Sequence, residues 1–170
     1  RHLAAAEVPR DFPPNVLIVE ATYGMQVHES REQRERRFTE AVERTVTRGG
    51  RVLIPVFALG RAQELMLVLE EYWAANPHLH GVPIFYAAKM AGKSLEVYRT
   101  YISAMNARIQ KQSVERNPWN FTHVQDVSPA DFRDNGPCVV MAAPGMLQNG
   151  FSRQLFDRWC EDAKNGVILT

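Results

Sequence analysis

Residues 48–65, RGGRVLIPVFALGRAQEL, contain the end of one helix, a buried strand and the start of a second helix. The glycine pair 49–50 is typical of a helix end, and the apolar run from Arg51 to Phe57 predicts a strand covered on both faces. A second helix opens near Gly60. Its apolar residues recur at helical spacing, at Ala62, Leu65, Met66, Leu69, Tyr72 and Trp73. A strand followed so closely by an amphipathic helix indicates a parallel α/β sheet.

The same alternation of strands and helices extends in both directions. Before this stretch, residues 15–20 (NVLIVE) predict a strand, and Ser30 with Gln33 forms a capping box that predicts a helix ending at the glycine pair. The later elements expected are a strand at 82–87, one helix from Leu95 to about Lys111, an edge strand at 121–124, a strand at 138–142, a helix at 152–161 and a strand at 166–170. The predicted fold is therefore α/β: one Rossmann-like, three-layer domain over residues 1–170, with a mainly parallel sheet flanked by helices.

Composition narrows the class of protein without naming a function. The 170 residues are 45% hydrophobic and 23% charged, with only 10 Gly and 10 Pro, which excludes collagen-like, low-complexity and disordered chains. The net charge of +1 gives no overall electrostatic case for a nucleic-acid partner. Its apolar runs are far shorter than the roughly 18 residues of a membrane span, so no membrane partner is expected. The chain lacks an initiator Met and stops in a predicted strand, so we expect a fragment of a larger, intracellular protein.

Ligands of parallel α/β sheets bind outside the carboxyl ends of the strands, so the residues after each strand are the candidates for a site. Four segments follow predicted strands: EATYG (20–24), ALGR (58–61), AKMAGK (88–93) and PGMLQNGFS (144–152). Their glycines, amides and cationic side chains suit the binding of phosphate oxygens.

Two residues of these segments have two interpretations each. Glu20 closes an apolar strand, where it is either a functional acid or a carboxylate that caps the turn at Tyr23. Arg61 opens a helix, where a cation opposes the helix dipole unless an anion or a salt bridge, to Glu64 or to Glu20, offsets it.

Other motifs are interpreted structurally. Residues 87–94, AAKMAGKS, resemble a phosphate-binding loop, but Ala87 replaces its first glycine, which favours a solvated lysine pair over a nucleotide site. His78 and His80 have no third ligand nearby, so no metal site is predicted in this chain. The charge run 31–37, REQRERR, is typical of a solvated helix face with salt bridges.

Longer segments carry a family resemblance: VEATYG, RGGRVLIPVFALGRAQEL, EEYWAANPHLHGVPIFYA and MAAPGMLQNGFSRQLF. With them the chain resembles, nearly end to end, the β-CASP region of the metallo-β-lactamase-fold nucleases, and most of all those that cleave pre-mRNA at the 3′ processing site before polyadenylation. The resemblance implies an endoribonuclease in which this chain is the cap domain. It implies two zinc ions, both held outside this chain, so that the chain alone is inactive.

The resemblance also implies roles for individual residues. Glu20 would be catalytic, because it would bond a downstream histidine and help that pair act as general acid toward the leaving oxygen. The candidate substrate-binding residues are Tyr23, Arg61, Lys89, Gln148 and Ser152. The chain departs from the family at Ala21, where relatives usually have serine, and at residues 89–93, which puts the shape and charge of the cleft in doubt.

The implied partners are pre-mRNA and other subunits of the cleavage and polyadenylation complex, including a non-catalytic β-CASP homologue and a scaffold subunit, in the nucleus. Two alternatives remain: a binding module in a non-catalytic partner subunit, or the Integrator endonuclease relative. A non-catalytic subunit has no reason to keep a carboxylate at Glu20.

Overall fold

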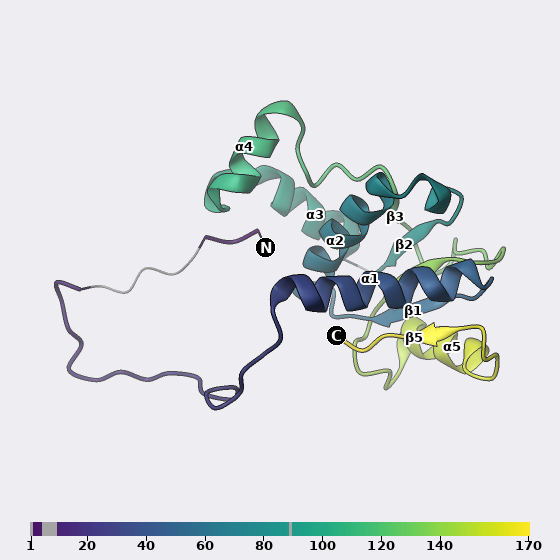
Figure 1. Ribbon diagram of the computed structural model, residues 1–170, viewed down its shortest axis with the longest axis horizontal. Coiled ribbons are helices and arrows are strands. Elements are labelled where there is room, and N and C mark those ends of the chain that lie inside the picture. The colour runs from purple at the N-terminus through teal and green to yellow at the C-terminus, as the bar shows by residue number, and fades with distance from the viewer. Residues whose placement is uncertain (1, 5–9, 89) are drawn as a thin grey trace.

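The computed structural model describes residues 2–4, 10–88 and 90–170 and shows a parallel sheet between layers of helices (Figure 1). The helices are α1 (Arg31–Thr47), α2 (Arg61–Ala75), α3 (Ala91–Thr100), α4 (Ala107–Glu115) and α5 (Gly150–Trp159). The strands are β1 (Val52–Pro55), β2 (Ile84–Ala87), β3 (Val124–Asp126), β4 (Val139–Ala142) and β5 (Gly166–Val167). Among these described residues, no helix has both the length and the apolar character that a membrane span requires.

The sheet has the strand order β3-β2-β4-β1-β5, and each neighbouring pair is parallel. β4 lies between β1 and β2, so the connection from β1 to β2 crosses over it. The predicted fold class is therefore confirmed. The edge strand expected at residues 121–124 lies a few residues later, at Val124–Asp126, and the last strand pairs over only two residues.

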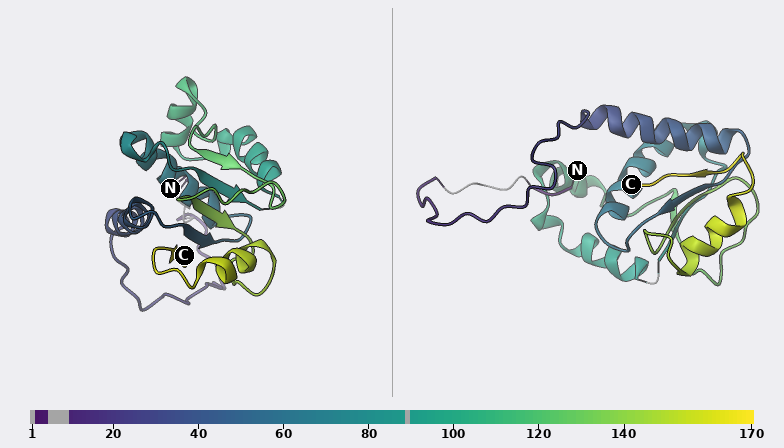
Figure 2. Two further views of the ribbon diagram at one scale, coloured as in Figure 1. Left: turned by 90° about the vertical axis from the view of Figure 1, so that its right-hand side faces the viewer. Right: turned by 90° about the horizontal axis from the view of Figure 1, so that it is seen from below.

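Alternate residues of the central strands fill two cores. Val52 and Ile54 of β1 face the larger core, which α1 and α2 cover with side chains such as Val42, Met66 and Trp73. Leu53 faces the opposite side, where Leu155 and Trp159 of α5 pack. The right-hand view of Figure 2 shows α1 and α5 on opposite sides of the strands. All four β1 side chains are buried, as a strand covered on both faces requires.

The helix starts and ends follow local signals. Ser30 accepts a hydrogen bond from the Gln33 amide (3.2 Å), and the Gln33 side chain accepts from the Ser30 amide (3.3 Å), so the predicted capping box is present. At the other end of α1, Gly49 has a positive φ of 84°. Gly50 lies against the Lys164 carbonyl so closely that a β-carbon would collide with it. The Arg48 Nε donates to the same carbonyl at 2.6 Å, which joins the α1–β1 turn to the α5–β5 turn.

The helix predicted from Leu95 to about Lys111 is wrong in its continuity. α3 ends at Thr100, a short turn covers Ile102–Ala104, and α4 begins after Asn106. Asn106 caps the new helix by accepting a hydrogen bond from the Ile109 amide (3.0 Å). The helical spacing of apolar residues continues across this break, because apolar side chains of both helices pack into the same core. The spacing alone therefore predicts a single helix.

The strand predicted at residues 15–20 is also wrong. Residues 10–29 form an irregular segment that leaves the carboxyl edge of the sheet and extends away from it (Figures 1 and 2). Val16, Leu17, Ile18 and Val19 are 71–93% exposed, and no strand of the described chain pairs with them. An apolar run gives a segment a preference for strand, but a strand also needs a neighbour to accept its hydrogen bonds.

Candidate functional site

Three of the four predicted site segments meet at the carboxyl edge of the sheet. Residues 58–61, the described residues 88 and 90–93, and residues 144–152 follow β1, β2 and β4, which are adjacent parallel strands. The fourth segment, residues 20–24, follows no strand and lies on the extended segment 10–29. The loops of this edge therefore form the candidate site, with Glu20 and Tyr23 outside the part that the sheet positions.

The loop between β1 and α2 is held by a fully buried side chain, Gln63. Its Oε1 accepts a hydrogen bond from the Gly60 amide (2.7 Å), and its Nε2 donates to the Ala58 carbonyl (3.1 Å). The Tyr86 hydroxyl donates to the same carbonyl at 2.5 Å, and burial raises the pKa of Tyr86 above its usual value. Gly60 has a φ of +96°, in the region that favours glycine. These bonds fix the direction in which Arg61 leaves the loop.

The loop between β4 and α5 is held in a similar way by Ser152. The Ser152 hydroxyl is fully buried and donates a hydrogen bond to the Pro144 carbonyl (2.6 Å). Because the side chain faces inward, it supports the loop in this structure and offers no surface to a substrate, unlike the predicted contact. Gln148 is exposed at the tip of this loop. Leu147 beside it has a φ of 55°, which is uncommon for a residue other than glycine.

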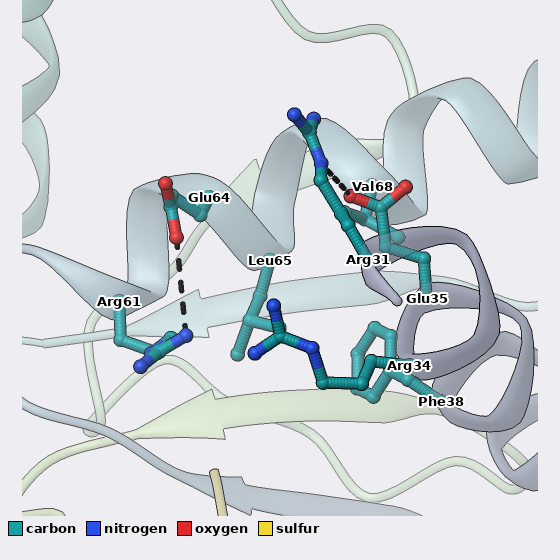
Figure 3. A pocket seen from close by; sticks show the side chains of 8 residues that line it. All are labelled: Arg31, Arg34, Glu35, Phe38, Arg61, Glu64, Leu65 and Val68. Carbon is teal, nitrogen blue, oxygen red and sulfur yellow. Dashed lines mark hydrogen bonds and ion pairs between the residues drawn. The ribbon is translucent and has the colours of Figure 1, made fainter. Parts of the chain in front are cut away.

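Arg61 is exposed at the start of α2 and borders two hollows. Its guanidinium lies 4.0 Å from the Glu64 carboxylate, so one of the salt bridges considered for it is present, at the outer limit of an ion pair. The first hollow, of about 240 Å³, lies between the first turns of α1 and α2 (Figure 3). The second, of about 370 Å³, lies at the carboxyl edge beside Phe57 and Leu147. The Arg61 side chain can therefore contact a ligand in either hollow.

Glu20 forms a turn cap in this structure. Its carboxylate accepts a hydrogen bond from the Thr22 backbone amide (2.9 Å), and the Gly24 amide donates to the Ala21 carbonyl (3.0 Å). Hydrogen bonds from Thr22 hold the pKa of Glu20 below its usual value. The side chain is exposed, so Glu20 lacks the burial expected for an acid at a strand end. Tyr23 is exposed and makes an edge contact with His28 (5.2 Å between ring centroids). The catalytic role of Glu20 stays a prediction.

The segment that resembles a phosphate-binding loop is arranged differently from a nucleotide site. Lys89 lies outside the described residues. Ser94 is buried beside Gln63, at 3.4 Å from its Nε2. A β-carbon at Gly92 would lie 3.1 Å from the Asp126 carboxylate, so an acid faces the start of α3. Burial raises the pKa of Asp126, against the opposing charge of Arg99. A carboxylate at this position disfavours a triphosphate.

A zinc site does not fit the described part of the chain. Within residues 2–4, 10–88 and 90–170, no three side chains of His, Cys, Asp or Glu are grouped so that they could hold a metal ion. His78 instead bonds the Glu43 carboxylate (2.7 Å), and His80 bonds the Trp73 carbonyl (2.9 Å).

Sequence reasoning missed two residues that organise the site. Gln63 lies among the apolar positions of a helix, and a polar residue at such a position is the signal that could have identified it as a buried anchor. Arg34 belongs to the charge run 31–37, and its alternation of signs hid the fact that this arginine faces the pocket beside Arg61.

The parallel sheet, its helical layers and the loops gathered at its carboxyl edge define a Rossmann-type α/β domain, a class in which ligands bind at that edge. The family model described as the Beta-Casp domain matches residues 62–170, and the chain belongs to the Beta-Casp family. The resemblance seen in the sequence is thereby confirmed.

Relatives match over the whole chain. It is 58% identical over 170 residues to cleavage and polyadenylation specificity factor 73 of Drosophila melanogaster, with 99% of the chain and 25% of that protein covered. It is 56% identical to cleavage and polyadenylation specificity factor subunit 3-I of Arabidopsis thaliana, covering 99% and 24%. It is 50% identical over 176 residues to endoribonuclease YSH1 of Saccharomyces cerevisiae, covering 100% and 22%. The chain thus spans about a quarter of the length of these proteins.

Proposed function

We propose that this chain is the β-CASP domain of an endoribonuclease that cleaves pre-mRNA at the 3′ processing site before polyadenylation. The observation that carries the proposal is identity of 50–58% along the whole chain with proteins named as an endoribonuclease and as cleavage and polyadenylation specificity factors. In this proposal the protein works in the nucleus with other subunits of the cleavage and polyadenylation complex, among them a non-catalytic β-CASP homologue and a scaffold subunit.

The carboxyl edge of the sheet would form the side of the domain that faces the RNA. Arg61 and Gln148 are exposed there and can donate hydrogen bonds to phosphate oxygens. The buried side chains of Gln63 and Ser152 hold the two loops in place. Arg61 follows the first of these loops, and Gln148 lies on the second. Buried anchors of this kind keep binding groups in place before the substrate arrives.

The two zinc ions of the proposed enzyme would belong to the part of the protein outside this chain, as the family resemblance implies. The described residues offer no ligand cluster. This chain would contribute an acid. Glu20 would accept a hydrogen bond from a histidine outside the chain. A carboxylate in this position stabilises the protonated imidazole, which can donate a proton to the leaving oxygen. The exposed apolar residues 16–19 just before Glu20 support this arrangement, because a larger protein can cover them.

The test is cleavage of a pre-mRNA substrate by the full-length protein and its Glu20→Gln variant. Glutamine keeps an oxygen that can accept the Thr22 amide, so the turn cap survives while the charge is lost. We expect cleavage to fall by about 10² to 10⁴, the contribution of a positioned general acid. The control is Glu161→Gln, which removes an exposed carboxylate after α5 and should leave cleavage unchanged.

Two results would contradict these statements. Cleavage by Glu20→Gln at the rate of the control would reduce Glu20 to a turn cap. A wild-type protein that cleaves no pre-mRNA, under conditions in which it is folded and loaded with zinc, would remove the proposed function itself.

A further inference from the structure

Three arginines and two glutamates, Glu35 and Glu64, line the pocket between α1 and α2, so positive charge is in excess there. Arg31 and Arg34 come from the first turn of α1, and Arg61 begins α2. The floor is apolar, because Phe38, Leu65 and Val68 line it. Arg31 is paired with Glu35 at 2.8 Å. Within the described chain, by contrast, the Arg34 guanidinium has neither an ion-pair nor a hydrogen-bond partner, and it is exposed to solvent.

The direction of these side chains indicates what the pocket can hold. Arg34 extends over Leu65 toward Arg61, so two guanidinium groups approach each other across the pocket (Figure 3). Like charges in this arrangement repel, and Arg61 also opposes the dipole of the helix that it begins. The 4.0 Å contact with Glu64 offsets this only in part, because exposed ion pairs contribute little. An anion between the two guanidinium groups would remove both penalties.

We propose that this pocket binds one phosphodiester group of an RNA strand, held between Arg34 and Arg61, with the attached sugar or base on the floor of Phe38 and Leu65. The planar forks of arginine match phosphate oxygens, and the apolar floor matches a nucleoside better than water. Arg61 also borders the hollow beside Phe57, so the strand can continue along the carboxyl edge. The proposal rests on the proposed function, since it takes RNA as the ligand.

Binding of a fluorescein-labelled oligoribonucleotide to the full-length protein, measured by anisotropy in EDTA to prevent cleavage, tests the proposal. Arg34→Ala and Arg61→Ala should each weaken binding about tenfold, as expected for a charged hydrogen bond. The double variant should lower the slope of log K against log salt by about 0.7, the value of one phosphate contact on a single strand. Arg44→Ala removes the same charge from the exposed last turn of α1, away from the pocket, and should change neither quantity.

A second arm identifies the phosphate. In a series of RNAs that each carry one neutral methylphosphonate, wild type should lose affinity at one position, and the double variant should not respond to that position. Arg34→Lys keeps the charge without the fork and should recover part of the affinity. Unchanged melting temperatures show that the variants are folded.

The outcomes separate this proposal from the proposed function. Arginine variants that bind RNA as the Arg44→Ala control does would overturn the pocket assignment, even in an enzyme that cleaves pre-mRNA. Poly-glutamate serves as a second probe. If Arg34→Ala loses poly-glutamate binding while its RNA binding is unchanged, the pocket is a carboxylate site and the pocket assignment is overturned too. Protein that binds RNA through this pocket but cleaves no pre-mRNA would overturn the function alone. Wild type without RNA affinity would overturn both.

Discussion

Replacing Gln63 with methionine should lower the free energy of unfolding by about 1–3 kcal/mol, because its two shorter hydrogen bonds contribute about 0.5–1.5 kcal/mol each. Two longer ones, at 3.4 Å to the Tyr86 and Ser94 hydroxyls, are lost with them. Methionine has a similar length, so little cavity is created. The bonds concerned join Gln63 to the Gly60 amide and the Ala58 carbonyl, at 2.7 and 3.1 Å. Tyr86 still donates to that carbonyl in the variant, so the Gly60 amide is the group left without a protein partner.

Urea unfolding of the 170-residue chain measures the loss of stability, and amide hydrogen exchange measures the loop. The Gly60 amide should exchange faster in Gln63→Met, while amides of β1 should change only with global stability. Gln112→Met, an exposed change of the same kind on α4, should stay within about 0.5 kcal/mol of wild type. Equal stability of the two variants, or unchanged exchange at Gly60, would refute the view that Gln63 holds the loop.

Glu70 accepts hydrogen bonds from the three backbone amides of residues 122–124 (2.6, 2.9 and 3.3 Å), so Glu70→Ala should cost about 1–3 kcal/mol in urea unfolding and speed exchange of those amides. Slow exchange there would show that β3 is held without it. Hydrogen bonds from Tyr72 and His78 lower the pKa of Glu43 below 4.5. The unfolded chain therefore takes up this proton first as the pH falls, and stability should drop below about pH 4.5. Tyr72→Phe should reduce that drop, and an identical acid profile would contradict the assignment.

Local signals explain why much of the fold could be predicted from the sequence. The capping box at Ser30, the glycine pair 49–50 and the buried run of β1 each act over a few residues, and the structure has each where it was expected. Residues 15–20 carry an equally strong apolar pattern and form no strand, because pairing depends on a neighbour that the pattern does not encode. The break at Asn106 is not predicted, because the apolar spacing continues on both sides of it and hides the capping signal of Asn106.

The site was predictable in position and less so in detail. The rule for parallel sheets located three loops at one edge, since it depends only on strand direction. Whether a polar side chain in such a loop faces out or in depends on packing. A substrate contact by Ser152 needs an outward side chain, and in the structure this side chain lies inward. The charge run predicts a solvated Arg34, and Arg34 is exposed. The run does not encode the packing of α1 against α2, which places Arg34 and Arg61 on one pocket.

Position 50 can serve as a reference position when this chain is aligned with distant members of its family. Any side chain at that position would meet the Lys164 carbonyl, so a member with a larger residue there must reroute the chain after α5. Substitution at position 50 and insertion or deletion near position 164 should therefore occur together in evolution. The end of the sheet opposite its carboxyl edge can thus serve to align homologues whose loops at that edge have diverged.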